Sequence, residues 1–157
     1  MSNYTQDLIK KFKEQYKLDS NDFWDLARGG KSTWIIKHNA LEKIAAQEKY
    51  TWKLEVLNFS PDVVVKCIAE SNDRIVESLG ESSSKNTMNS YPYAMAETRA
   101  VDRCILKLLN AHAYLYSESE ADDFKQPTTN KMEAIIKHGK SKSSNCHRLI
   151  GGFPSRW

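Results

Sequence analysis

Three cationic side chains, Arg99, Arg103 and Lys107, recur every four residues in one long amphipathic segment. Residues four apart in an α-helix lie one above the other, so this spacing predicts a basic stripe along one helical face. Guanidinium and ammonium groups in such a row suit the binding of a polyanion. They equally suit structural pairing of the two arginines with Glu97 and Asp102. The spacing alone leaves both interpretations open.

Other basic residues stand where a phosphate group could approach the chain. Arg28 and Lys31 flank the turn Gly29-Gly30, whose backbone carries no side chains that would keep a phosphate away. Backbone recognition of nucleic acid uses distributed positive charge of this kind, and its affinity falls as salt rises. The candidate DNA-binding residues are Arg28, Lys31, Lys37, Lys66, Arg99, Arg103 and Lys107. Aromatic residues close to them in the sequence, Trp34, Tyr91 and Tyr93, are candidates for stacking on exposed bases.

No catalytic or metal-binding motif is complete. Gly30-Lys31-Ser32 resembles the end of a phosphate-binding P-loop, but Asp25 stands where that motif needs its first glycine. The four histidines are scattered, and no two cysteines have zinc-site spacing. We therefore expect no enzymatic activity, no catalytic residue, no metal and no cofactor. A small hydrolase with an unrecognised cysteine or glutamate is the weakest of the alternatives.

The composition is that of an ordinary globular protein. The chain has 157 residues, of which 40% are hydrophobic and 27% charged, and this length suggests one domain with a real core. No apolar run approaches the roughly 20 residues that span a bilayer, and the N-terminus lacks a signal-peptide pattern. These observations predict a cytoplasmic protein with no membrane association. Cys67 and Cys104 lie in apolar patterns and are expected to be buried free thiols.

Charge is unevenly distributed along the chain. The net charge is +3, yet residues 125–157 hold seven basic residues and one acid, which gives +6 there and −3 for residues 1–124. An acidic segment at 117–123 precedes the basic tail. A basic tail behind a folded body is typical of polyanion binding or of a solvated, unstructured segment. The predicted organisation is an N-terminal helix at 1–19, a core at 20–124 and a flexible tail at 125–157.

Hydrophobic periodicity predicts an α+β fold. An antiparallel β-meander of about three to four strands packs against the long helix, with N-terminal helices ahead of it. One face of the sheet is covered and the other is free for solvent or a partner. The expected helices are 3–17, 22–28 (with Ser20 as its cap), 39–48 and 91–110, and the expected strands are 33–37, 52–56, 63–69 and 74–79.

Several strings, in this order, resemble the single-strand DNA annealing proteins, the superfamily of the eukaryotic Rad-type annealing recombinase and the phage Sak-type recombination proteins. The resemblance covers residues 20–124. It is carried by Arg28-Gly29-Gly30-Lys31 followed by TWIIKH, by NALEKIAAQ leading to Thr51-Trp52, by DVVVKCIAESNDRIVESLGESS, by AMAETRAVDRCILKLL, and by Ser117-Glu118-Ser119-Glu120.

The resemblance implies binding and ATP-independent annealing of single-stranded DNA in phage-type recombination or repair, within the host cytoplasm if the chain is phage-encoded. It implies a DNA groove between the meander and the rest of the fold, repeated around a homo-oligomeric ring or filament. A nuclease or a single-strand-binding protein is then a candidate partner. Family DNA contacts carry over to Arg28 and Lys107, whereas the basic positions that relatives have beside Lys107 are Leu106 and Asn110 here. The string NSYPYAM replaces the GNYG-like string that precedes this helix in some relatives.

A function from another class also fits the pattern. A non-catalytic protein–protein adaptor would use the free sheet face, with its tryptophan and tyrosine residues, to dock a partner protein.

Overall fold

A computed structural model describes residues 3–28, 30–85 and 91–125 of the chain. The chain divides into two units, Met1–Phe124 and Lys125–Trp157, and the fold described here is that of the first. Residues 126–157, which hold most of the basic tail and Cys146, lie outside the described part. In chain order the elements are α1 (Asn3–Tyr16), a 3-10 turn (Ser20–Asp22), β1 (Phe23–Arg28), β2 (Lys31–Ile36), α2 (His38–Gln47), β3 (Thr51–Asn58), β4 (Val63–Glu70), β5 (Ile75–Ser82), α3 (Pro92–Leu108), β6 (Leu115–Ser117) and α4 (Glu118–Lys125).

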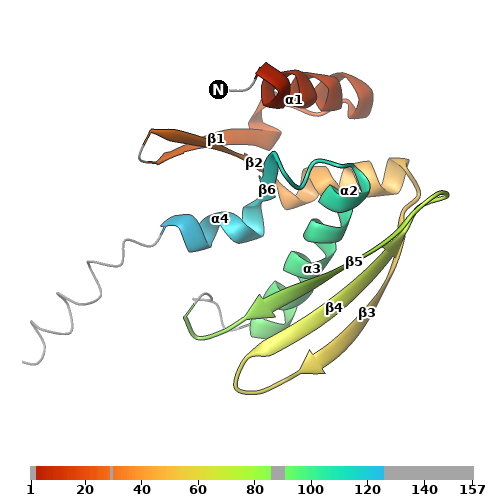
Figure 1. The fold of residues 1–157 in the computed structure, drawn as a ribbon, viewed down its shortest axis with the longest axis vertical. Coiled ribbons are helices and arrows are strands. Elements are labelled where there is room, and N and C mark those ends of the chain that lie inside the picture. The colour runs from red at the N-terminus through yellow and green to blue at the C-terminus, as the bar shows by residue number, and fades with distance from the viewer. Residues whose placement is uncertain (1–2, 29, 86–90, 126–157) are drawn as a thin grey trace, which may run out of the picture. The chain divides into compact units, whose positions relative to one another are not determined.

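The described strands form two separate three-stranded sheets (Figure 1). β3, β4 and β5 form an antiparallel meander in chain order. β1 and β2 form an antiparallel hairpin, and β6 adds to β2 in parallel to complete the second sheet, which we call the hairpin sheet. The predicted α+β class, with a long helix packed on an antiparallel meander, is confirmed.

The segment 22–28 is a strand, and its prediction as a helix is wrong. Asp19 and Asp22 cap the short 3-10 turn reciprocally, and the chain then enters β1 in extended conformation at Phe23. β1 pairs along its whole length with β2, from Phe23 opposite Ile36 to Arg28 opposite Lys31. Backbone pairing with a neighbouring strand therefore overrides the local helical preference of residues such as Leu and Ala. This pairing cannot be predicted from the periodicity of the segment itself.

The meander is buried on one face only. Along β4, Val63, Val65, Cys67 and Ala69 are buried, while the residues between them are half-buried. This alternation follows from the two-residue period of a strand. The other face leaves apolar side chains in solvent, among them Leu57 on β3 and Ile75 and Leu79 on β5. The prediction of one covered and one free sheet face is confirmed.

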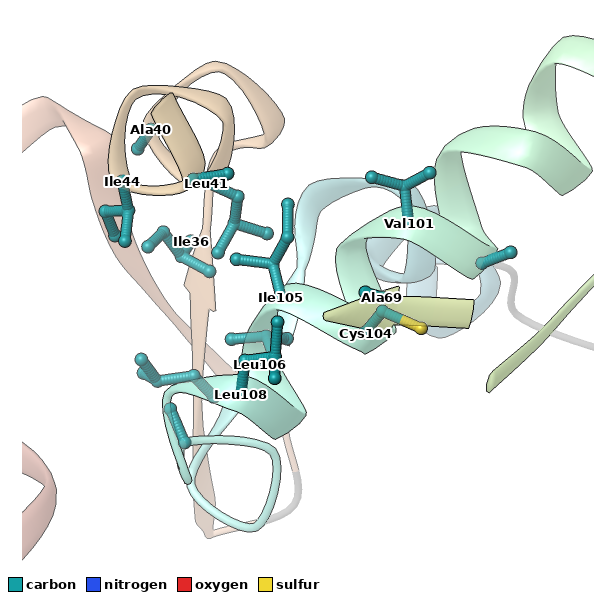
Figure 2. Packing of buried hydrophobic residues seen from close by; sticks show 14 of the residues in the cluster. Ile36, Ala40, Leu41, Ile44, Ala69, Val101, Cys104, Ile105, Leu106 and Leu108 are labelled. Atoms are coloured by element: carbon teal, nitrogen blue, oxygen red, sulfur yellow. The ribbon is translucent and has the colours of Figure 1, made fainter. Parts of the chain in front are cut away.

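Helix α3 forms the centre of the core and contacts both sheets. Pro92 occupies its first turn, where a missing N–H costs nothing. In Figure 2, Cys104 lies beside Ala69 of the meander, whereas Ile105 points toward Leu41 of α2 and Ile36 at the end of β2. The predicted core face of this helix, Val101, Cys104, Ile105 and Leu108, is buried throughout.

A glycine sets how closely α3 approaches the meander. Gly80 of β5 lies directly against Ala96 and Ala100, and a Cβ added there would overlap the carbonyl oxygen of Ala96. Both alanines are completely buried. Small residues on the two elements therefore bring the helix backbone against the strand, which places the side chains of α3 within reach of the edge of β5.

Candidate functional site

The predicted basic stripe of α3 lies along the outer edge of β5. Among the strands that the structure describes, β5 pairs with β4 alone, so the carbonyl groups on its other side face none of them. Three hydrogen bonds from the stripe reach these carbonyl oxygens: Arg99 Nη1 donates to Glu81 (2.7 Å), Arg103 Nη1 to Leu79 (2.6 Å) and Lys107 Nζ to Glu77 (2.7 Å). The spacings match, because four helical residues rise about 6 Å and two strand residues about 6.6–6.8 Å. The stripe therefore covers an edge that would otherwise invite pairing with another strand.

Arg99 is part of the core. Its side chain is only 1% exposed, and its Nε also donates to the carbonyl oxygen of Ser119 (3.2 Å). A buried guanidinium bound to main-chain oxygens is not accessible to a phosphate from solvent. Arg99 therefore has a structural role and is not part of the ligand site.

Arg103 has an acidic partner from α4. Its Nε lies 2.6 Å from Oε1 of Glu120, and 32% of the arginine side chain is exposed. The other carboxylate oxygen of Glu120 accepts from the backbone N–H of Ser117 (3.4 Å). With two of its N–H groups bound by Glu120 and Leu79, the guanidinium still has three donors for another partner.

Two hollows flank the outer edge of β5, and Ser78, Arg103 and Lys107 line both of them. The sheet-side groove has a volume of 560 Å³ and extends onto the free face of the meander, where Leu57, Lys66, Glu77 and Leu79 complete its lining. The β6-side groove has a volume of 250 Å³, and its remaining lining residues are Leu106, His112, Leu115, Tyr116 and Glu120. Arg103 and Lys107 thus stand at the wall between the two grooves.

The other predicted cations occupy separate places. Lys66 lies in the sheet-side groove, where its Nζ is 2.9 Å from Glu77 Oε2, and this contact raises the pKa of Lys66 and lowers the pKa of Glu77. The backbones of Arg28 and Lys31 pair in register at the end of the β1–β2 hairpin, and Lys31 is exposed. Lys37 is the residue that precedes α2, at its N-cap position, and is half-buried. The structure therefore brings together Lys66, Arg103 and Lys107, whereas Arg28 and Lys31 belong to the β1–β2 hairpin.

The hairpin geometry also excludes a P-loop at Gly30-Lys31. A strand does precede this turn, because β1 ends at Arg28. However, the turn leads into β2 and not into a helix, so no helix N-terminus is present there to bind a phosphate.

Sequence reasoning missed a buried polar network at the N-terminus of α2. Nδ1 of His38 lies 2.6 Å from Oδ1 of Asp102 on α3, and Ser119 Oγ donates to the other Asp102 oxygen (3.2 Å). Ser117 and Ser119 contact each other through their hydroxyl groups (2.8 Å). His38 and Asp102 are 64 positions apart, so no local pattern in the sequence relates them.

The order of groups in this network argues for a structural role. In a nucleophilic triad the imidazole stands between the hydroxyl and the carboxylate, whereas here the carboxylate of Asp102 stands between the imidazole and the hydroxyl. The hydrogen bond that Asp102 accepts from His38 raises the pKa of His38, and burial raises the pKa of Asp102. The network joins α2, α3 and the start of α4 into one unit.

Two cysteines form a buried contact between α3 and the meander. Cys67 and Cys104 are free thiols, as predicted, and both are completely buried. Cys104 Sγ donates to the carbonyl oxygen of Cys67 (3.4 Å). The hydrogen bond with Cys104, followed by burial, raises the pKa of Cys67, so its thiol stays protonated and unreactive.

The predicted stacking residues have different surroundings. Trp34 packs against the core and is half-buried. Tyr91 and Tyr93, at the start of α3, are 75% and 41% exposed. Phe59, which the sequence did not single out, lies against Tyr93 and is 71% exposed.

The described part of the chain holds no cluster of three or more His, Cys, Asp or Glu side chains arranged to bind a metal. Among those same residues, no helix is both long enough and apolar enough to cross a membrane. No protein-family model, curated protein or solved structure matches this chain.

Proposed function

We propose that this chain binds single-stranded DNA through its phosphate backbone and promotes annealing without ATP. The observation that carries the proposal is the position of Arg103 and Lys107, which line the grooves on both sides of the β5 edge. Each keeps free donors after its bond to a β5 carbonyl, since an arginine has five N–H donors and a lysine three. A phosphate backbone crossing this edge would meet both cations.

The arrangement of elements supports the same proposal. The strings that resemble the annealing proteins fall, in order, on the β1–β2 hairpin, α2, the meander and α3. The two positions to which the resemblance assigns DNA contacts, Arg28 and Lys107, lie on the hairpin tip and beside the grooves. Annealing of complementary strands is downhill once their charge is neutralised, so the proposed activity requires positive surface and no nucleotide cofactor.

A salt titration tests the binding. A labelled oligo-dT is titrated with the protein between about 50 and 200 mM salt, and the logarithm of affinity is expected to fall linearly with the logarithm of salt. Arg103→Gln and Lys107→Gln are each expected to weaken binding and to reduce the steepness of this line by about 0.7, the value for one lost single-strand phosphate contact. Lys43→Gln, which removes an exposed lysine of α2, is the matched control and is expected to bind normally.

Circular dichroism of each variant separates lost binding from lost fold. Absence of binding at low salt, or binding that does not respond to salt, would overturn the proposal. If both groove variants bind as the wild type does while remaining folded, the site has been placed on the wrong surface.

The annealing step needs its own measurement. Two complementary strands, one carrying a fluorophore and the other a quencher, are mixed with and without the protein in the absence of ATP and metal. The expected result is faster quenching with the protein, and Lys107→Gln is expected to reduce the acceleration. Binding without any acceleration would restrict the function to strand protection.

The free sheet face favours a second candidate function, that of a protein–protein adaptor. Ile75 is 70% exposed, and Leu57 and Leu79 are each about half exposed. Light scattering with and without an oligonucleotide distinguishes the two functions, because the annealing function predicts large rings or filaments on DNA. An adaptor would keep its size when DNA is added.

A further inference from the structure

Two exposed aromatic rings stack on each other at the N-terminal end of α3. Phe59 lies in the turn between β3 and β4, and Tyr93 lies in the first turn of α3. Their ring centroids are 6.4 Å apart and their planes differ by only 15°. Phe59 is 71% exposed and Tyr93 41%. Single exposed apolar residues are common, but two large parallel rings in one place form an apolar surface that marks a binding site.

The backbone holds both rings in place. The side chain of Asn58 donates to the carbonyl oxygens of Ser60 (3.3 Å) and Asp62 (2.8 Å), and these bonds close the turn that carries Phe59. Tyr93 belongs to the first turn of α3, which the hydrogen bond from Met95 N to Tyr91 O fastens (3.2 Å). A surface ordered in advance loses little conformational entropy when a ligand binds.

A second exposed aromatic pair differs from Phe59 and Tyr93 in the angle between its ring planes. Tyr4 and Tyr114 are also exposed and in contact, with ring centroids 4.7 Å apart, but their planes are tilted by 51°. The faces of rings tilted in this way are not parallel, so a flat ligand cannot continue the pair as a stack. The near-parallel rings of Phe59 and Tyr93 form a stack, and a flat aromatic ligand extends such a stack by lying against a ring face.

The rings and the cationic site are carried by neighbouring segments of the same elements. Leu57, which lines the sheet-side groove, precedes Phe59 by two residues. Tyr93, Ala100 and Lys107 recur every seven residues, or about two helical turns, and Ala100 lies against the meander. Tyr93 and Lys107 thus lie on the same side of α3, about 21 Å apart along its axis. A single strand stacked at about 3.4 Å per nucleotide covers this distance with about six nucleotides.

We propose that Phe59 and Tyr93 form a base-stacking platform that holds a nucleobase of the strand whose phosphates contact Arg103 and Lys107. This inference rests on the proposed function and adds to it an aromatic contact at a fixed distance from the cations. A stacking contact with a base is independent of sequence, because every base has a flat aromatic face.

The test compares an ordinary oligo-dT with an abasic oligonucleotide of the same length, about twelve nucleotides, so that both carry the same phosphates. The wild-type protein is expected to bind the oligo-dT about tenfold more tightly. The double variant Phe59→Leu/Tyr93→Leu is expected to lose this preference while its affinity for the abasic strand stays unchanged. Tyr4→Leu/Tyr114→Leu is the matched control and is expected to keep the full preference. Phe59→Trp, which retains a stacking ring, is expected to keep it as well.

The outcomes separate the two proposals. If the wild type binds both oligonucleotides equally, or if the double variant keeps the preference for bases, the platform is overturned and the phosphate site stands. If the double variant weakens both oligonucleotides to the same degree, the rings act on the fold or the groove and the platform is again overturned. If the wild type binds neither oligonucleotide, the proposed function fails, and the platform fails with it.

Discussion

The exposed side chains at the two ends of α3 have different kinds of partner within the fold. Toward the C-terminus, the cations Arg103 and Lys107 stand beside an open groove, yet each is bonded to a carbonyl oxygen of β5. Toward the N-terminus, Tyr93 stacks on another exposed ring, Phe59. The charged groups therefore have a structural reason to be where they are. The ring pair instead places two large apolar side chains in solvent, which indicates a ligand.

The same comparison divides the basic stripe itself. Arg99 is buried and bound to two carbonyl oxygens, whereas Lys107 has one such bond at the rim of a groove. The cations of the stripe are equally spaced in the sequence, but their burial decreases from Arg99 in the core to Lys107 at the surface. Variants of Arg99 and Lys107 test this gradient, and three further measurements test the contacts of α3 with β5, Glu120 and His38.

The largest expected effect is the loss of stability in Arg99→Met. The substitution keeps an apolar stem of similar length but removes the donors to Glu81 and Ser119, and we expect the free energy of unfolding to fall by about 3–5 kcal/mol. Lys107→Met is the comparison variant and is expected to lose about 0.5–1 kcal/mol. Urea denaturation followed by circular dichroism measures both. Equal losses would show that the stripe is uniform and that burial does not divide it.

A smaller loss is expected when α3 is pushed away from β5. Gly80→Ala places a methyl group against the backbone of α3, and we expect a loss of about 1–3 kcal/mol in the free energy of unfolding. Ser78→Ala, on the same strand, is the control and is expected to change stability by less than about 0.5 kcal/mol. The measurement is again urea denaturation. A neutral Gly80→Ala would mean that the helix is free to shift, so its fixed contact with the β5 edge would be disproved.

The ion pair between Arg103 and Glu120 is expected to compete with a phosphate. Glu120→Gln removes the negative charge 2.6 Å from the guanidinium, and we expect single-stranded DNA to bind about two- to fivefold more tightly. Glu70→Gln, at the exposed end of β4, removes one charge elsewhere and controls for the general gain in positive charge. Fluorescence anisotropy with labelled oligo-dT measures both variants. An equal gain in the two would argue against a phosphate at Arg103.

The smallest expected effect is a pH dependence of stability from His38. Its hydrogen bond with Asp102 raises the pKa of the imidazole above its unfolded value, and burial shifts the pKa of Asp102 in the same direction. The folded chain therefore holds protons more tightly than the unfolded chain. The part contributed by His38 is complete below the ordinary pKa of histidine and is lost as pH rises through the folded-state pKa of His38.

Urea denaturation at a series of pH values from mildly acidic to mildly alkaline measures this loss. His38→Gln is expected to flatten the curve, because glutamine does not titrate in this range. The neighbouring carboxylates Glu42 and Glu118 also favour the protonated imidazole, so Glu42→Gln is expected to reduce the slope only slightly. If His38→Gln shows the same dependence of unfolding free energy on pH as the wild type, the His38–Asp102 network is not its cause.

The sequence alone was sufficient for the parts of the fold that have a clear local period. Alternation in β3 and β4 and the 3.6-residue pattern of α2 and α3 predicted those elements and the one-sided burial of the meander. Each strand or helix was long enough for its side-chain pattern to show which face is buried. The buried state of Cys67 and Cys104 followed from the same patterns.

Tertiary structure decided what depends on partners far away in the chain. β1 is a strand because β2 pairs with it, and β6 is too short, at three residues, to leave a period in the sequence. The roles of the α3 cations depend on the carbonyl oxygens of a strand about twenty to thirty residues earlier, and Phe59 meets Tyr93 only because the β3–β4 turn and the start of α3 come together. Periodicity reports which face of an element is buried, but only long-range packing determines which group each side chain meets.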